Sequence, residues 1–105
     1  MPESYSLVLS TAGTAQEADR LAEMLVSSKL AACVQIVNIA SVYTWEGEMH
    51  KEPEYLLLIK TAAGRYAEVE SAIVQHHSYE IPEIVQVPIE RGLPAYLAWI
   101  AANTK

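Results

Sequence analysis

Hydrophobic and polar positions along the first third of the chain predict one strand followed by one helix. The run 5–10 is rich in β-prone residues and ends in a turn at 11–13. Thr14 and Glu17 then have the spacing of a capping box, in which each side chain bonds a free backbone N–H of the other. Apolar residues recur behind them at helical spacing, and we expect this helix to end near Ser28 or Lys29.

The middle of the chain predicts a long β-hairpin. Residues 33–45 are rich in valine and isoleucine, contain no glycine or proline, and end in Tyr43 and Trp45, which favours one long strand. Residues 46–48 supply a turn, and we expect the returning strand at 55–61.

The last part of the chain predicts a helix, a strand and a closing helix. The helix starts at Tyr66 and ends at His76 or His77, and the strand covers 84–89, where Pro88 favours an edge position. Pro94 suits the first turn of the closing helix. The order βαββαβ with an extra C-terminal helix predicts an α+β, ferredoxin-like antiparallel sheet with helices on one face. We expect a single domain over residues 1–105.

Two features predict that this domain assembles with copies of itself. A strand of 13 residues is about 43 Å long, whereas a domain of this length is roughly 33 Å across. The facing strands also carry apolar side chains on both faces of the sheet, although helices cover only one. The alternative is that the long strand bends at a bulge and covers itself.

Composition and charge limit which binding partners and which cellular compartment we expect for this protein. The chain has 7 basic and 13 acidic residues, a formal net charge of −6, which disfavours nucleic acid and anionic membranes as partners. Cys33 is the only cysteine, so no intrachain disulfide can form and a reducing compartment is favoured. The first residues lack the pattern of a signal peptide, and no apolar run is long enough for a membrane helix. We expect a cytoplasmic protein.

Five short motifs together resemble the CutA divalent-cation tolerance proteins. The match runs from the first strand to the last helix in the order and spacing of that family, with the motifs KLAACV at 29–34, YxWEG at 43–47, LIKT at 58–61, HHxYxxPEI at 76–84 and YLxWI at 96–100. The resemblance implies a tight homotrimer in which long hairpins are exchanged between neighbours. It also implies a role in tolerance of copper or other divalent metals, and a possible signalling role.

His76 and His77 are the first candidate metal ligands, because neutral imidazole suits Cu(II), Zn(II) and Ni(II). Neighbouring positions on a regular helix point about 100° apart, so a single ion needs a frayed helix end or a ligand from another subunit. The alternative is that these histidines complement the dipole at a helix C-terminus. The family resemblance implies copper contacts at this pair.

Cys33 is the second candidate ligand, because a thiolate suits soft metals. A lone cysteine at the start of an apolar strand also acts as a small buried hydrophobic residue. Some metal-binding members of the family carry a cysteine where this chain has Ser10, and serine is a poor ligand for soft metals. The acidic residues near 46–54 are more typical of a solvated hairpin tip.

Trp45, Lys60, Tyr79 and Glu83 form a further candidate group near the expected protomer boundaries. They frame either an intersubunit pocket for a small ligand or a salt bridge that locks the trimer.

Three functions follow from these residues: a metal-responsive trimer, a small-ligand sensor or scaffold without a direct metal role, and an enzyme. Catalysis is disfavoured, since no nucleophile triad or phosphate loop is present and Pro2 lies on a polar tail. We expect a divalent cation such as Cu(II) and no organic cofactor.

Overall fold

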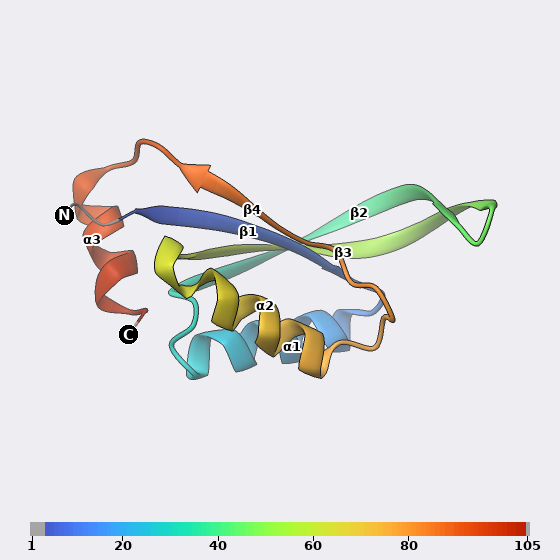
Figure 1. Cartoon of the computed structure of the whole chain (residues 1–105), viewed down its shortest axis with the longest axis horizontal. Coiled ribbons are helices and arrows are strands. Elements are labelled where there is room, and N and C mark those ends of the chain that lie inside the picture. Colours follow the sequence, from blue (N-terminus) through green and yellow to red (C-terminus); the bar gives the residue numbers. More distant parts are fainter. Residues whose placement is uncertain (1–3, 105) are drawn as a thin grey trace.

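The structure, a computed structural model, describes residues 4–104, so Pro2 lies outside the described residues. The elements follow in the predicted order, as Figure 1 shows: β1 (Tyr5–Ala12), α1 (Ala15–Ser27), β2 (Cys33–Trp45), β3 (Glu48–Ala62), the short 3-10 helix η1 (Ala63–Arg65), α2 (Tyr66–His76), β4 (Ile84–Ile89) and α3 (Pro94–Ala102). The predicted bounds of β2 and β4 are confirmed, and so are the start of α2 and the position of Pro94 in the first turn of α3.

The four strands form one antiparallel sheet in the order β2-β3-β1-β4. β4 pairs only with β1, so Pro88 lies on an edge strand as predicted. Helices α1 and α2 lie on one face of the sheet, and α3 lies at the end where β1 begins (Figure 1). Buried apolar side chains between this face and the two helices form the core: Val8, Leu21, Leu25, Leu57, Ile59, Val69 and Ile73.

The β2–β3 hairpin projects from the domain, as the length of β2 predicted. β1 pairs only with residues 55–62 of β3, so residues 48–54 are paired with β2 alone. The molecule is therefore elongated, with extents of 46 × 25 × 22 Å. The turn has positive φ at Glu46 (51°) and Gly47 (80°), as a two-residue hairpin turn requires.

Three strand boundaries differ from the sequence prediction: β1 continues to Ala12 and not to residue 10, β3 ends at Ala62 and not at 61, and the largest difference is at the start of β3. β3 begins at Glu48 and not at residue 55, so the acidic segment 48–54 is strand and not part of a turn. Pro53 disfavours a strand prediction for this segment, because proline lacks the N–H that a central strand needs. The fold tolerates it because this part of β3 has a strand on one side only.

The face of the sheet opposite α1 and α2 is apolar and partly exposed. Cross-strand partners Leu7 and Val87, and Leu9 and Val85, share this face, and the two valines are 43% and 46% exposed. β2 pairs residue by residue with β3 from Cys33 to Trp45 without a bulge. The alternative that β2 bends at a bulge and covers itself is therefore wrong.

Candidate functional site

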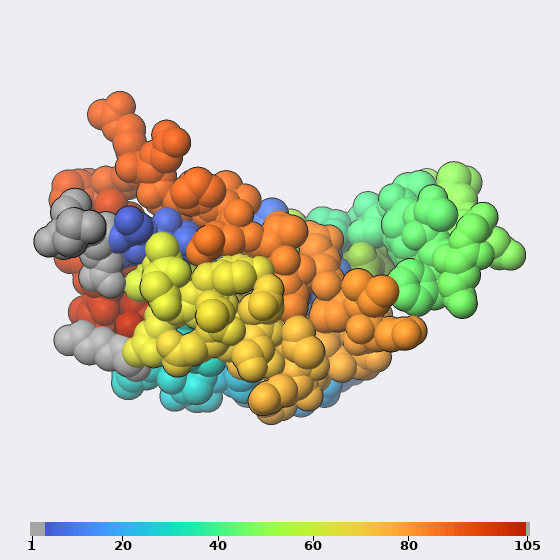
Figure 2. Space-filling model, viewed as in Figure 1, coloured from blue at the N-terminus to red at the C-terminus, as the bar shows by residue number. Residues whose placement is uncertain are grey.

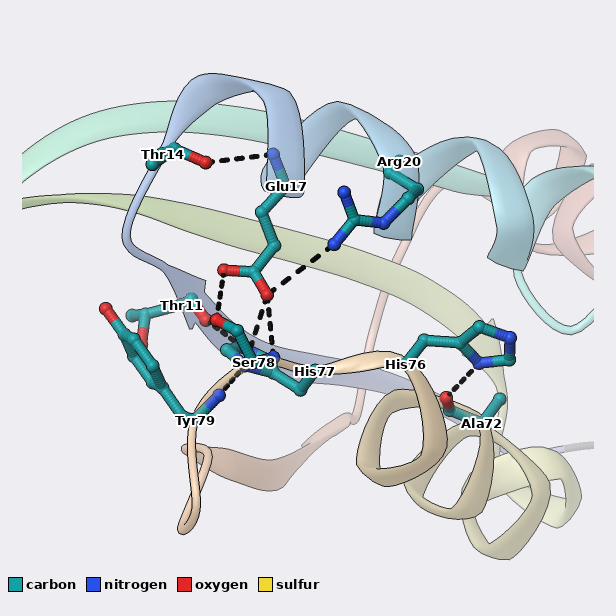
Figure 3. Close-up of polar contacts among 9 residues, drawn as sticks. All are labelled: Thr11, Thr14, Glu17, Arg20, Ala72, His76, His77, Ser78 and Tyr79. Atoms are coloured by element: carbon teal, nitrogen blue, oxygen red, sulfur yellow. Dashed lines mark hydrogen bonds and ion pairs between the residues drawn. The ribbon is translucent and has the colours of Figure 1, made fainter.

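The turn after α2 is held to the start of α1 by a fully buried histidine. The side chain of His77 has no exposed surface, and its Nε2 lies 2.6 Å from the carbonyl oxygen of Thr11. The N–H of Tyr79 donates to His77 Nδ1 at 3.0 Å. Because Nδ1 accepts, the hydrogen-bond pattern assigns the proton to Nε2, which donates to Thr11. Both ring nitrogens of His77 are therefore occupied (Figure 3).

Glu17 completes this connection from α1. Its carboxylate accepts hydrogen bonds from the N–H of Ser78 at 2.8 Å and from the Ser78 hydroxyl at 3.0 Å (Figure 3). Burial raises the pKa of Glu17, but the two hydrogen bonds from Ser78 lower it by more, so the net pKa lies below its ordinary value. Thr14 caps α1 as predicted, whereas the Glu17 side chain turns to Ser78 and not back to Thr14.

His76 has a different environment from its neighbour. It is exposed, and its Nδ1 lies 2.8 Å from the carbonyl oxygen of Ala72, one turn earlier in α2. Figure 3 shows its ring pointing away from His77. His76 is the last residue of α2 and His77 already has extended backbone, so the two imidazoles diverge and the observed conformation does not let them chelate one ion.

Cys33 lies far from both histidines. It is half-buried and in register with Lys60, which pairs with Leu7 on β1. His77 bonds Thr11, four positions further along β1, which corresponds to about 13 Å. Across residues 4–104 no group of three or more His, Cys, Asp or Glu side chains is placed to hold a metal ion. One protomer therefore does not bring His76, His77 and Cys33 into one site. Ser10, at the position where some family members carry a cysteine, is buried within the sheet.

A groove of about 710 Å³ lies between the projecting part of the hairpin and the loop 78–83. Figure 2 shows the hairpin extending beyond the body that carries this loop. Trp45 from β2 and Tyr79 and Glu83 from the loop all line the groove, so three of the four predicted pocket residues lie together. The remaining walls come from Thr11, from Ser41, Val42 and Tyr43 of β2, and from Glu54 of β3.

Lys60 does not belong to this groove in a single protomer. Its ammonium donates to Gln35 Oε1 and lies 5.9 Å from the ring centroid of Tyr96 in α3. The expected group of four is therefore divided, because four strand positions separate Lys60 from Leu56, the partner of Thr11.

Glu54 is the groove residue that sequence reasoning misplaced, because it was assigned to a solvated tip. It is only 9% exposed, and its Oε2 accepts a 2.7 Å hydrogen bond from the Tyr79 hydroxyl. Burial, followed by the Glu54 carboxylate, raises the pKa of Tyr79 far above its ordinary value. The signal that could have found Glu54 is its two-residue spacing from Leu56, which places both on one face of a longer β3.

Comparison with known proteins identifies the family. The model of the CutA1 divalent ion tolerance protein family matches residues 6–103. The chain belongs to the CutA1 family. Among relatives within it, a divalent-cation tolerance protein CutA of Archaeoglobus fulgidus is 41% identical over 96 residues, 91% of this chain and 94% of its own length. A chloroplastic CutA 1 of Oryza sativa is 41% identical over 87 residues, 82% of this chain and 49% of its own length.

Solved structures of CutA1 proteins share the whole architecture. The A. fulgidus structure, described as a periplasmic divalent cation tolerance protein CutA, superposes with a TM-score of 0.94 at 39% identity, covering 96% of this chain and 99% of that one. CutA1 from Oryza sativa gives 0.94 at 37% identity, with coverage of 97% and 94%. These matches confirm the CutA resemblance and the α+β class. Between residues 4 and 104, no helix has both the length and the apolar character needed to span a membrane.

Proposed function

We propose that the chain is a trimeric divalent-cation tolerance protein that binds Cu(II) or another divalent ion. The observation that carries this proposal is membership of the CutA1 divalent ion tolerance family over residues 6–103. The proposed role in metal response or signalling requires no catalysis, and the proposal includes no enzymatic activity and no organic cofactor. The strand order β2-β3-β1-β4 supports assigning the protomer to the ferredoxin-like class.

The trimer is supported by the apolar face opposite α1 and α2. Leu7, Leu9, Val85 and Val87 lie on it, and an apolar face of this kind marks a contact with another chain. Helix α3 adds Leu93, Tyr96 and Trp99, which are 70%, 39% and 44% exposed. A homotrimer would cover these surfaces and would bring the ends of separate sheets together.

Of the predicted ligands, His76 is the one we propose as the primary metal contact. Its ring is exposed and its Nε2 is directed away from the Ala72 carbonyl that Nδ1 approaches. One imidazole alone holds a metal weakly, because tight sites need three or four protein ligands. Further ligands would therefore come from another subunit. His77 would join only if the turn opened and released its bonds to Thr11 and Tyr79.

Calorimetric titration of tag-free protein with Cu(II) against a competing chelator tests this role. We expect saturable binding that is lost in His76→Ala. His50→Ala, at a histidine on the distant hairpin, is the matched control and should bind as the wild type does. Absence of saturable binding, or equal binding by His76→Ala and wild type, would show that the metal role is indirect.

A second function is supported by the groove between the hairpin and the loop 78–83. Its volume of about 710 Å³ is in the range of small-molecule sites. We propose as the alternative a trimeric small-ligand sensor or interaction scaffold with no direct metal role, in which Trp45, Tyr79 and Glu83 line the pocket and Lys60, which bonds Gln35, stays outside it. Binding of a small ligand that is unchanged in His76→Ala would favour this alternative.

A cytoplasmic location is part of the proposal. It is supported by the lack of a second cysteine, since Cys33 alone cannot form an intrachain disulfide. Relatives differ in this respect, since the A. fulgidus structure is described as periplasmic and plant relatives as chloroplastic. Fractionation of cells that express the untagged chain is the direct test.

A further inference from the structure

We propose that the groove between the hairpin and the loop 78–83 binds a small organic cation with an apolar body, such as an aryl-alkyl ammonium compound. This inference rests on the second function above, the small-ligand role of the groove, and does not depend on metal binding at His76.

The first observation is a buried carboxylate without a cation. Glu54 is only 9% exposed, and among residues 4–104 no Lys, Arg or His side chain forms an ion pair with it. Its Oε2 is held by the Tyr79 hydroxyl at 2.7 Å, which orients the group. A single neutral donor leaves most of the hydrogen-bonding capacity of a carboxylate unused, and a buried charge is costly unless it is paired. Glu54 therefore provides a fixed anionic contact in the groove wall.

The second observation is that every charged side chain in the groove has the same sign. Glu80 and Glu83 line it together with Glu54, and the lining contains no basic residue from the described part of the chain. Such a cavity concentrates cations and repels anions, and the net charge of −6 adds to this effect. Phosphates and carboxylic acids are therefore the wrong class of ligand.

The third observation is the aromatic and apolar character of the remaining walls. Tyr43, Trp45 and Tyr79 line the groove, with Val42, Ile81 and Pro82 beside them. Aromatic rings attract cations and also cover apolar groups, whereas a bare metal ion requires several converging oxygen or nitrogen ligands. The described residues contain no cluster of three such metal ligands. Carboxylates and rings in one cavity suit an ammonium group attached to an aromatic or aliphatic body.

Fluorescence titration of a Trp99→Phe protein tests the proposal, because Trp45 in the groove is then the only tryptophan. The probes are phenethylammonium, its neutral analogue phenylethanol and the anionic phenylpropanoate. We expect saturable quenching or shift by phenethylammonium, with the other two at least about tenfold weaker because each lacks the charge-assisted bond to a carboxylate.

Glu54→Gln in the same background should weaken phenethylammonium binding by about tenfold or more, since its amide still accepts from Tyr79 but carries no charge. Glu90→Gln, an equal charge change at the far end of β4, should bind as the parent does. Light scattering confirms that each variant keeps the parent's oligomeric state. Equal binding of phenylethanol, or of Glu54→Gln, would overturn the cation preference and leave the groove as a ligand site. Absence of binding by all three probes would overturn both the inference and the small-ligand function.

Discussion

The carboxylate of Glu17 accepts two hydrogen bonds from Ser78, which lies 61 positions further along the chain. The contact joins the first turn of α1 to the segment that follows α2. This segment continues through Tyr79 into the groove, so the position of one groove wall depends on a carboxylate outside it.

Replacing Glu17 by Gln should destabilise the protein in a pH-dependent way. At neutral pH we expect a loss of about 1–3 kcal/mol, because the amide cannot accept both bonds from Ser78. Folding lowers the pKa of Glu17 from 4.5. The stabilisation is therefore present above that unfolded-state pKa and is lost as the pH falls through the lower folded-state pKa. Urea unfolding at fixed protein concentration, from neutral pH to about pH 3, should show the two stabilities converging in acid.

Glu23→Gln is the control for that experiment, since Glu23 is an exposed residue of the same helix. Its stability should follow the wild type at every pH. A Glu17→Gln deficit that persists unchanged in acid would contradict the role given to the charge.

The two adjacent histidines should differ sharply in their effect on stability. His77→Ala removes a fully buried ring together with its hydrogen bonds to the Thr11 carbonyl and the Tyr79 N–H, which should cost about 2–4 kcal/mol. His76→Ala removes an exposed ring and should change the stability by no more than about 1 kcal/mol. Denaturant midpoints of the two variants, measured side by side, test this. Similar losses for both would show that the assigned hydrogen bonds of His77 contribute little.

Gly13 and Tyr79 should be coupled in a double-mutant cycle. A Cβ at Gly13 would lie 2.9 Å from the Tyr79 hydroxyl oxygen, so Gly13→Ala must displace the ring from Glu54. We expect a loss of about 1–3 kcal/mol, which is smaller in a Tyr79→Phe background because the clashing oxygen is gone. Thermal unfolding of the four proteins gives the coupling. Gly64→Ala, where a Cβ meets nothing within 4 Å, should be neutral or slightly stabilising. Strict additivity in the cycle would contradict the close approach.

Val85→Glu and Val74→Glu form a matched pair that tests the trimer. Val85 is 46% exposed on the apolar face of the sheet, and Val74 is 56% exposed on α2, on the opposite side. A charge at Val85 would be buried in the proposed interface, so we expect dissociation of the trimer. Light scattering coupled to size exclusion should show smaller species for Val85→Glu and the wild-type mass for Val74→Glu. A wild-type protein that is monomeric at micromolar concentration would contradict the assembly itself.

Most elements were predictable because local patterns signal them. The period of apolar residues marks α1, the unbroken β-branched run marks β2, and Pro88 marks β4 as an edge. The position of the hairpin turn, at Glu46 and Gly47, was equally predictable, because glycine can adopt the positive φ that the hairpin needs. The start of β3 was not predictable from the sequence, since Pro53 and a run of charged residues resemble a loop when their strand partner is unknown.

The sequence by itself determined the elements, their order and the family to which the motifs point. Only the tertiary structure decided which polar side chains meet: Glu17 with Ser78, Tyr79 with Glu54, and His77 with a backbone carbonyl of β1. The tertiary structure also places Lys60 outside the groove and gives the rings of His76 and His77 different environments. The physical reason is that element formation depends on neighbours a few positions away, whereas these pairs depend on strand register and on how helices lie on the sheet. A two-residue spacing gives the face of a strand but not the residue that faces it.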